Sequence, residues 1–312
     1  MPDIPTVQRA DGVYIIDTRH MGNSGTVAVF LLESTDGLIL IESGPGSTLE
    51  NVRTGIRQAG FNPADIRHIL VTHIHLDHAG GAGELAKETG ATVYVHERGY
   101  KHLHDPSRLL SSAERIYGDR MDELWGTIMP IPTKRLVSLS GGETLNIGGR
   151  TFKPIYTPGH ASHHLAYLLD DGALFTGDAA AIHFEGSAVI RPALPPPEID
   201  LDIWQESVAR MLAAEPKRLL LTHYGEVQDA ASHLERIGER NRVWAEEILT
   251  GMKQGEDEAA LVERISNLGN RELAADGAPS DVTRRHQLTS NYEMTVMGLS
   301  RYWQKQHPER LG

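Results

Sequence analysis

Short runs of Val, Ile and Leu alternate with turn residues along much of the chain and predict β-strands. Asp11-Gly12 and Asp36-Gly37 separate the first runs, and such pairs are typical of hairpin turns. Segments with apolar residues three or four positions apart predict helices between the strands. The expected strands are 13–17, 26–32, 38–42, 69–72, 92–95, 135–139, 143–147, 152–157, 165–169, 173–176 and 218–222, and the expected helices include 48–59, 81–89 and 201–214.

The same order of elements occurs twice, around residues 13–95 and 135–222. Each half has strands followed by helix, strand, helix and strand, which fits two sheets packed face to face with helices outside. We therefore expect an α+β fold, a four-layer αββα sandwich, as a catalytic domain over residues 1–224. Residues 100–132 are mainly helical and are expected to form a lid insertion between the two halves.

After Tyr224 the pattern becomes wholly helical, with apolar stripes that each predict one buried helix face. We expect residues 225–312 to form a helical C-terminal extension that packs on the sandwich or on a second copy, giving a homodimer. The stripes are Val227, Ala231, Leu234, Ile237, Trp244 and Ile248, then Leu261, Ile265 and Leu268, then Leu288, Tyr292, Val296, Leu299 and Trp303.

The chain of 312 residues is acidic, with 42 Asp and Glu against 30 Lys and Arg and a formal net charge of -12. This balance argues against nucleic acid or an anionic membrane as a partner, and leaves a small-molecule substrate as the expectation. No apolar run is long enough to cross a membrane. Met1-Pro2-Asp3-Ile4-Pro5 lacks a signal-peptide pattern, so we expect a cytoplasmic protein.

The densest group of metal-capable side chains is His73-Ile74-His75-Leu76-Asp77-His78, directly after the expected strand 69–72. Residues 73, 75 and 77 alternate on an extended tail and should point into one cavity, while His78 starts the next turn and faces another direction. One loop could therefore serve two metal ions. The chain has no cysteine, so imidazole and carboxylate are its only strong metal ligands.

Three later candidate ligands, His160, Asp178 and His223, each follow an expected strand. A single histidine at a strand end is usually a hydrogen-bonded structural residue, but three such positions beside the cluster favour a shared site. Functional sites in layered α/β folds collect at such strand ends because the strands hold the loops rigidly. Together the seven side chains predict a two-metal hydrolytic centre.

Over about residues 10–224 the chain resembles the metallo-β-lactamase-fold hydrolase superfamily. The resemblance lies in His73-x-His75-x-Asp77-His78, Pro158-Gly159-His160, Gly177-Asp178 and Thr222-His223. It implies two divalent metal ions, expected to be Zn²⁺ with Fe or Mn as alternatives, and a hydroxide that bridges them. Asp77 would orient this hydroxide or transfer a proton during the reaction. By this resemblance the first ion is bound by His73, His75 and His160, the second by Asp77, His78 and His223, and both by Asp178.

Glu42 and His164 lie near the expected ligands in the sequence or in its motifs, and each is expected to support the metal site or the fold. The superfamily usually has Asp-x-Gly after an early strand, where this chain has Glu42-Ser43-Gly44. Glu42 should still lie behind the ligands, although it can sit differently from an aspartate. His164 is expected either to be a structural strand histidine or to support a ligand. The absence of cysteine in the third-ligand region argues against the true β-lactamase branches.

The run Thr157–His164 and the helical C-terminal region are similar to glyoxalase II-like thioester hydrolases. We therefore expect hydrolysis of a small ester, thioester, lactone or phosphoester. Acyl-homoserine lactonases remain an alternative, although their tyrosine three residues after the bridging Asp is Ala181 here. A mononuclear iron persulfide dioxygenase-like enzyme and a non-catalytic binding module are further alternatives. The candidate substrate-binding residues are Tyr117, Trp125, His183 and Tyr224.

Overall fold

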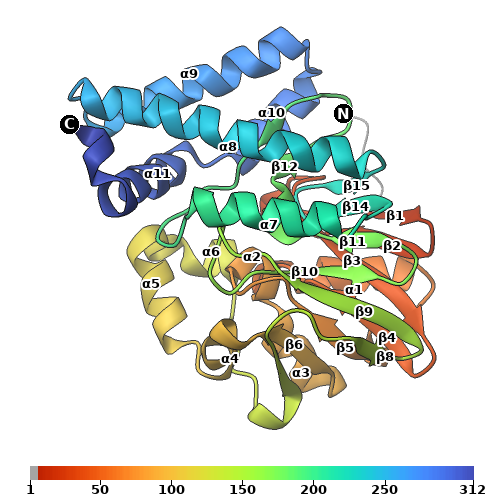
Figure 1. Cartoon of the computed structure of the whole chain (residues 1–312). Coiled ribbons are helices and arrows are strands. Elements are labelled where there is room, and N and C mark those ends of the chain that lie inside the picture. The colour runs from red at the N-terminus through yellow and green to blue at the C-terminus, as the bar shows by residue number, and fades with distance from the viewer. Residues whose placement is uncertain (1–5) are drawn as a thin grey trace.

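Two β-sheets lie face to face, with helices on both outer surfaces (Figure 1). The computed structural model describes residues 6–312. Residues 1–5, on which the expected absence of a signal peptide depends, lie outside this range. The α+β four-layer sandwich and the helical C-terminal extension predicted from the sequence are confirmed. No helix within the described residues is both long and apolar enough to cross a bilayer.

The first sheet has strands in sequence order, antiparallel from β1 to β4 and parallel from β4 to β7. Helices α1 (Leu49–Gln58) and α3 (Ala82–Thr89) connect parallel strands and cover the outer face. Strand β1 was not expected from the sequence. The strands are β1 (Val7–Ala10), β2 (Val13–Asp17), β3 (Ala28–Ser34), β4 (Gly37–Ile41), β5 (Ile66–Leu70), β6 (Thr92–His96) and β7 (Leu136–Leu139).

The second sheet has the order β15-β14-β11-β10-β9-β8. Its parallel pair, β11 and β14, is joined through α7 (Leu201–Ala213), which covers the outer face. A separate hairpin of β12 (Ile182–His183) and β13 (Ile190–Arg191) lies between β11 and α7. The other strands are β8 (Leu145–Ile147), β9 (Arg150–Tyr156), β10 (Leu165–Leu169), β11 (Ala173–Phe175), β14 (Arg218–Leu221) and β15 (Gly225–Val227).

Strand β3 shows why the sheets stack in this way. Side chains alternate between the two faces of a strand. Phe30 and Leu32 point into the core between the sheets, where Phe30 packs edge-to-face on Phe175 at 5.3 Å. Val29 and Leu31 point into the core under α1 and α3. Because both faces of β3 are buried from Ala28 to Leu32, this part of the strand is continuously apolar instead of alternating with polar residues.

The expected insertion at residues 100–132 contains α5 (Ser107–Tyr117) and α6 (Met121–Trp125) and the end of α4 (Glu97–His104), which begins three residues earlier. The carbonyl of Leu124 accepts hydrogen bonds from His20 Nε2 at 2.8 Å and Ser47 Oγ at 2.7 Å. At Gly126 an added Cβ would lie 2.6 Å from the Ser47 nitrogen. The end of the insertion is therefore fixed to the sandwich, while α5 lies at the edge of the molecule (Figure 1).

The C-terminal extension contains α8 (Ala230–Lys253), α9 (Glu258–Asp276), α10 (Ser280–Thr289) and α11 (Tyr292–Gln306). Its apolar residues share one core with α7, and Trp244 of α8 and Trp204 of α7 are both completely buried in it. The extension therefore packs on the sandwich of its own chain, and a homodimer stays a prediction. The expectation that residues after Tyr224 are wholly helical is wrong, because the chain reverses at Gly225 and β15 pairs with β14.

Candidate metal centre

Four connections bring the candidate ligands together, each after the C-terminal end of a strand. The segment after β5 carries His73, His75, Asp77 and His78. The connections after β9, β11 and β14 carry one ligand each. They are His160, Asp178 and His223. These seven side chains form two groups that could each hold a metal ion, His73, His75, His160 and Asp178 in the first, and Asp77, His78 and His223 in the second.

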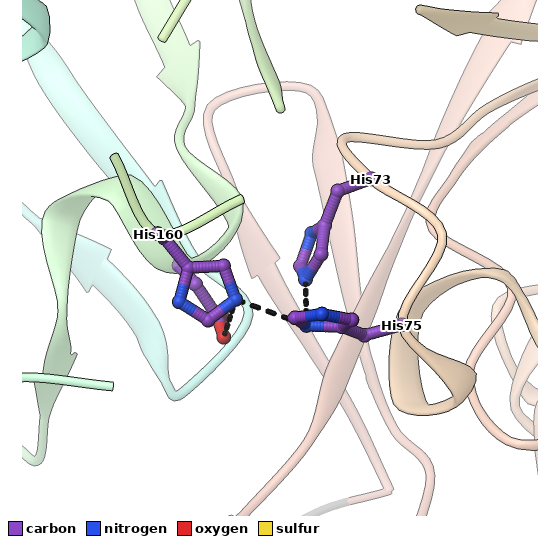
Figure 2. A group of neighbouring side chains, drawn as sticks. His73, His75 and His160 are labelled. Atoms are coloured by element: carbon purple, nitrogen blue, oxygen red, sulfur yellow. Dashed lines mark hydrogen bonds and ion pairs between the residues drawn. The ribbon is translucent and has the colours of Figure 1, made fainter. Parts of the chain in front are cut away.

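In the first group, ring nitrogens converge on one point. His75 Nδ1 lies 2.9 Å from His73 Nε2 and 3.0 Å from His160 Nε2, as Figure 2 shows. Asp178 Oδ2 lies 3.3 Å from His160 Nε2. A tetrahedral zinc ion with Zn–N bonds of about 2.0–2.1 Å places its ligand atoms about 3.3–3.4 Å apart. The spacing of these four atoms is therefore close to that of a metal site.

The second group lies around the short helix α2 (Leu76–Ala79). Asp77 Oδ2 is 3.6 Å from His78 Nε2 and 3.4 Å from His223 Nε2. The sequence predicted that Asp77 points the same way as His73 and His75. This is wrong in detail, because α2 begins at Leu76 and turns the carboxylate toward His78. The grouping is the one that the family resemblance implied.

Asp178 faces both groups with different oxygens. Its Oδ2 faces His160, while its Oδ1 lies 3.2 Å from His78 Nε2 and 3.4 Å from His223 Nε2. Asp178 Oδ1 and His78 Nε2 are buried, yet neither forms a hydrogen bond. Buried polar atoms are normally satisfied, so their lone pairs need another partner. A divalent cation on each side of the carboxylate fits this requirement.

The ring nitrogen that faces away from the centre is occupied in most of these histidines. His78 Nδ1 lies 2.9 Å from Glu42 Oε1, and His73 Nδ1 lies 3.0 Å from Thr72 Oγ1. His160 Nδ1 and His223 Nδ1 each donate to a backbone carbonyl at 2.8 Å, that of Ala193 and that of Thr26 respectively. Such partners fix the ring orientation and leave the inner nitrogen unprotonated for a metal.

Glu42 is the most heavily bonded of these supports. Its Oε1 accepts from Thr72 Oγ1 at 2.5 Å and from Thr222 Oγ1 at 3.3 Å, and its Oε2 accepts from the Thr72 backbone nitrogen at 3.1 Å. The backbone of Glu42 has a φ of 62°, in the left-handed region that costs a non-glycine residue about 1–2 kcal/mol. The contacts of the carboxylate offset this cost, because the conformation lets Glu42 reach His78 Nδ1, the ring nitrogen that faces away from the centre.

His164 supports the centre through the backbone. Its Nδ1 lies 2.8 Å from Thr157 Oγ1, and its Nε2 accepts a hydrogen bond from the Asp178 nitrogen at 3.2 Å. The side chain is completely buried. His164 therefore connects the turn that carries His160 to the turn that carries Asp178.

The charges in the centre are arranged for a cation. Burial lowers the pKa of His75 to about 3 and, with neighbouring imidazoles, holds the pKa of His73 well below its usual value. Burial opposes ionisation of Asp77, but His78 and His223 outweigh it and lower the pKa of this carboxyl. Burial likewise opposes a charge on His78, whose pKa is nevertheless raised by the surrounding carboxylates. His73 and His75 are therefore held neutral, as metal binding requires, whereas His78 would release a proton when a metal ion binds.

The candidate substrate residues fall into two places. Tyr117 and Trp125 meet in the insertion with ring centroids 5.1 Å apart, and the Tyr117 hydroxyl donates to Met294 Sδ at 3.5 Å. His183 and Tyr224 instead pair through their backbones beside His223. The His183 Nδ1 donates to a hairpin carbonyl, and the Tyr224 side chain lies in the core between the sheets.

Several residues that shape the centre were not expected from the sequence. Thr72 directly precedes the His cluster, and this position is the one signal that could have identified it. Trp204 packs edge-to-face on His160 at 5.7 Å. Gly159, with a φ of 130°, lies so close that an added Cβ would be 2.4 Å from Trp204. The Ala193 carbonyl is a backbone group and has no sequence signal.

The arrangement of the ligands in a four-layer sandwich agrees with the comparison of the sequence with known families. Residues 22–223 match the family model described as the metallo-beta-lactamase superfamily. The chain belongs to this superfamily. The family expected from the ligand motifs is therefore confirmed.

Similarity to individual proteins agrees with this family. The metallo-beta-lactamase fold-containing protein ST1585 of Sulfurisphaera tokodaii is 36% identical over 161 residues, which are 51% of this chain and 60% of ST1585. Its crystal structure, described as from Sulfolobus tokodaii, matches with a TM-score of 0.61 and 27% identity over 75% of this chain and 86% of that chain.

Two relatives carry names of thioester-cleaving enzymes. Thioesterase pkgB of Emericella nidulans is 27% identical over 190 residues, 59% of this chain and 45% of pkgB. Hydroxyacylglutathione hydrolase of Shewanella halifaxensis is 28% identical over 156 residues, 50% of this chain and 47% of that enzyme. The aligned regions thus span about half the length of these two enzymes.

Proposed function

We propose that the protein is a dinuclear metal-dependent hydrolase that acts on a small thioester. The observation that carries the proposal is the division of the Asp178 carboxylate, with Oδ2 3.3 Å from His160 Nε2 and Oδ1 3.2 Å from His78 Nε2. A carboxylate that faces two sets of imidazoles with separate oxygens fits a bridging ligand. Two divalent cations held by these residues would lower the pKa of a bound water and polarise the scissile oxygen.

The donor set supports zinc as the metal. The two groups contain imidazole nitrogens and carboxylate oxygens, which suit Zn²⁺ and also Fe or Mn. A mononuclear iron dioxygenase would need only one group of ligands. The second group, Asp77, His78 and His223, would then have no role, although Glu42 is held in a strained backbone conformation to support it. This second group favours the dinuclear hydrolase.

Asp77 is proposed to orient the attacking water and to relay its proton. Its side chain is 24% exposed, against 7% for Asp178 and none for His78, so it marks the side from which substrate enters. On the insertion, burial and the negative charge of Asp77 raise the pKa of Tyr117 above its usual value, so its hydroxyl stays protonated at neutral pH. This hydroxyl donates to Met294 Sδ at 3.5 Å, a weak acceptor that it would exchange for an oxygen of the substrate. We propose that the insertion acts as a lid through α5.

A thioester is favoured over the other ester-type bonds by two considerations. Pairwise similarity extends to a thioesterase and to a hydroxyacylglutathione hydrolase. The position of the lactonase tyrosine is Ala181, which is completely buried and has no hydroxyl. The glyoxalase II-like branch is thus the proposed one, with the acyl and thiol parts of the substrate unassigned.

The test is hydrolysis by the zinc-loaded protein of four substrate classes at equal concentration. These are an S-acylglutathione, an acyl N-acetylcysteamine thioester, an acyl-homoserine lactone and an aryl phosphoester. We expect both thioesters to exceed the other two in kcat/KM by at least tenfold, and chelation of zinc to abolish the activity. Equal or greater activity on the lactone or the phosphoester would overturn the substrate class, and activity that survives complete metal removal would overturn the mechanism.

A further inference from the structure

The hairpin of β12 and β13 touches ligands of both metal groups. On β12, the His183 nitrogen donates to the His223 carbonyl at 2.7 Å, and the Tyr224 nitrogen donates to the His183 carbonyl at 3.0 Å. Two residues after β13, the Ala193 carbonyl accepts the hydrogen bond from His160 Nδ1 at 2.8 Å. One short hairpin therefore fixes the backbone of His223 and the ring orientation of His160.

The C-terminal extension holds this hairpin through Arg191, whose side chain is completely buried. Arg191 Nη2 donates to the Gly269 carbonyl of α9 at 2.6 Å, and Nη1 donates to the Tyr292 hydroxyl at 2.7 Å and to Ser290 Oγ at 3.0 Å. The guanidinium also lies 5.6 Å from the centre of the Trp244 ring of α8. Arg191 thus contacts three parts of the extension from a position two residues before Ala193.

The turn of the hairpin is held by the same extension. The Asp276 carboxylate of α9 accepts from Ser187 Oγ at 2.6 Å and from the Ala188 nitrogen at 3.1 Å. From α8, Arg236 Nη2 donates to the Ala188 carbonyl at 2.6 Å. Both ends of the hairpin are therefore bonded to helices that lie outside the αββα sandwich.

The segment that follows Ala193 packs directly on α11. An added Cβ at Gly298 would lie 2.3 Å from the Leu194 carbonyl oxygen, so the two backbones are in close contact. Further along, Arg301 Nε donates to the Pro197 carbonyl at 3.0 Å. Because the extension leaves so little room here, a change in α11 must move the backbone next to Ala193.

A buried guanidinium is costly unless its N–H groups are satisfied. Among residues 6–312, the two Nη atoms of Arg191 donate to neutral oxygens of the extension, while its Nε is buried without a hydrogen-bond partner. A charge buried in this way serves to fix geometry, since its planar group holds several acceptors in defined directions.

From these contacts we infer that the C-terminal extension is part of the scaffold of the metal centre, and that Arg191 is a positioning residue for the ligand His160. The inference rests on the proposed dinuclear centre. The extension holds the hairpin, the hairpin holds the Ala193 carbonyl, and the carbonyl keeps the inner nitrogen of His160 directed at the first metal group.

The first test compares Arg191→Met with Arg240→Met in the full-length, zinc-loaded protein. Arg240 pairs with Glu272 inside the extension at 2.9 Å and so controls for the loss of an extension arginine. Zinc release is followed with a chromogenic chelator. Loss of a partner behind a ligand typically weakens metal binding about 10–100-fold. We expect Arg191→Met to release one of its two zinc equivalents at least tenfold faster than the wild type does. Arg240→Met should release both equivalents at the wild-type rates.

A second pair of variants decides the question if Arg191→Met fails to fold. Gly298→Ala pushes on Leu194, whereas Gly251→Ala adds the same methyl group against the Leu261 side chain inside the extension. We expect accelerated release of one zinc equivalent from Gly298→Ala only. General destabilisation would instead affect both equivalents in both variants. Wild-type release rates in folded Arg191→Met or in folded Gly298→Ala overturn the inference. A wild-type protein that binds no zinc overturns the proposed function and the inference together.

Discussion

Glu42 Oε1 lies 2.9 Å from His78 Nδ1, and both side chains are completely buried. This contact joins the end of β4 to the short helix that follows β5. It gives His78 a negatively charged partner on the nitrogen that faces away from the centre, which makes the inner nitrogen a stronger metal ligand. Because Glu42 also binds Thr72 and Thr222, the same carboxylate connects three of the segments that meet at the site.

The first prediction concerns the charge on Glu42. In Glu42→Gln the side chain keeps its shape but loses its charge, so His78 should bind metal less strongly. We expect the second zinc equivalent to bind about 10–100-fold more weakly, while the first is unchanged. Titration with zinc against a competing chelator measures both. Glu33→Gln, an exposed position on β3, is the matched control. Unchanged affinity for both equivalents in folded Glu42→Gln would refute the role of this contact.

The second prediction concerns the bridge. Asp178→Ala removes both oxygens that face the two groups, so it should reduce bound metal and abolish hydrolysis. Elemental analysis and the thioester assay together report the two effects. Asp171→Ala, on the turn before β11, is the control for loss of a carboxylate near that strand. If Asp178→Ala retained two metal ions and the wild-type rate, the ligand assignment would be wrong.

The third prediction concerns the lid. Tyr117→Phe removes one hydroxyl without changing the ring that packs on Trp125. Loss of one hydrogen bond to the reacting substrate corresponds to roughly tenfold in kcat/KM. We expect this loss with unchanged zinc content, and no loss in Tyr14→Phe, whose ring packs on Phe61 away from the centre. Equal kcat/KM in Tyr117→Phe and wild type would exclude Tyr117 from substrate binding.

The fourth prediction concerns stability in acid. His286 of α10 is completely buried, and both of its ring nitrogens lack a hydrogen-bond partner. Burial, with the nearby charges of Arg191, His183 and Arg285, lowers its pKa to about 3. The unfolded chain binds a proton at a pKa of about 6.5 while the folded chain does not, so stability falls as the pH falls below 6.5.

Between pH 6.5 and 5 this histidine should lower the free energy of unfolding by about 1.6 kcal/mol, since the slope rises toward about 1.4 kcal/mol per pH unit below pH 6.5. His286→Leu removes this titrating group, so the free energy of unfolding of the variant should fall by that much less over the same pH range. Chemical denaturation of wild type and variant at the two pH values measures the difference, and the acid sensitivity of the metal centre cancels because both proteins contain it. An identical loss in the two proteins would show that His286 does not titrate in this range.

The clustering of the candidate ligands could be predicted from the sequence because each follows a strand within a short, local motif. His73, His160, Asp178 and His223 each come soon after a strand end, and strand ends follow from the apolar pattern. The direction of Asp77 could not be predicted from alternation, because the start of α2 at Leu76 depends on packing against the rest of the fold.

The parts that the sequence did not reveal depend on backbone groups and on contacts across long separations. Strands β12 and β13 have only two residues each, too few for a periodic signal. The Ala193 carbonyl supports His160 through a main-chain atom that any residue has. Arg191 directly precedes the proline-rich run 192–197, and its partners lie some 80 to 100 residues later in the chain. Such contacts appear only when the extension folds onto the sandwich.

The most direct test of the dinuclear centre is the zinc content of the wild-type protein after saturation with zinc and removal of the unbound metal. Because Asp178 divides its oxygens between two groups, each with its own histidines, elemental analysis should find two zinc ions per chain. A single bound ion per chain would contradict the account, since one of the two groups would then have no metal to hold.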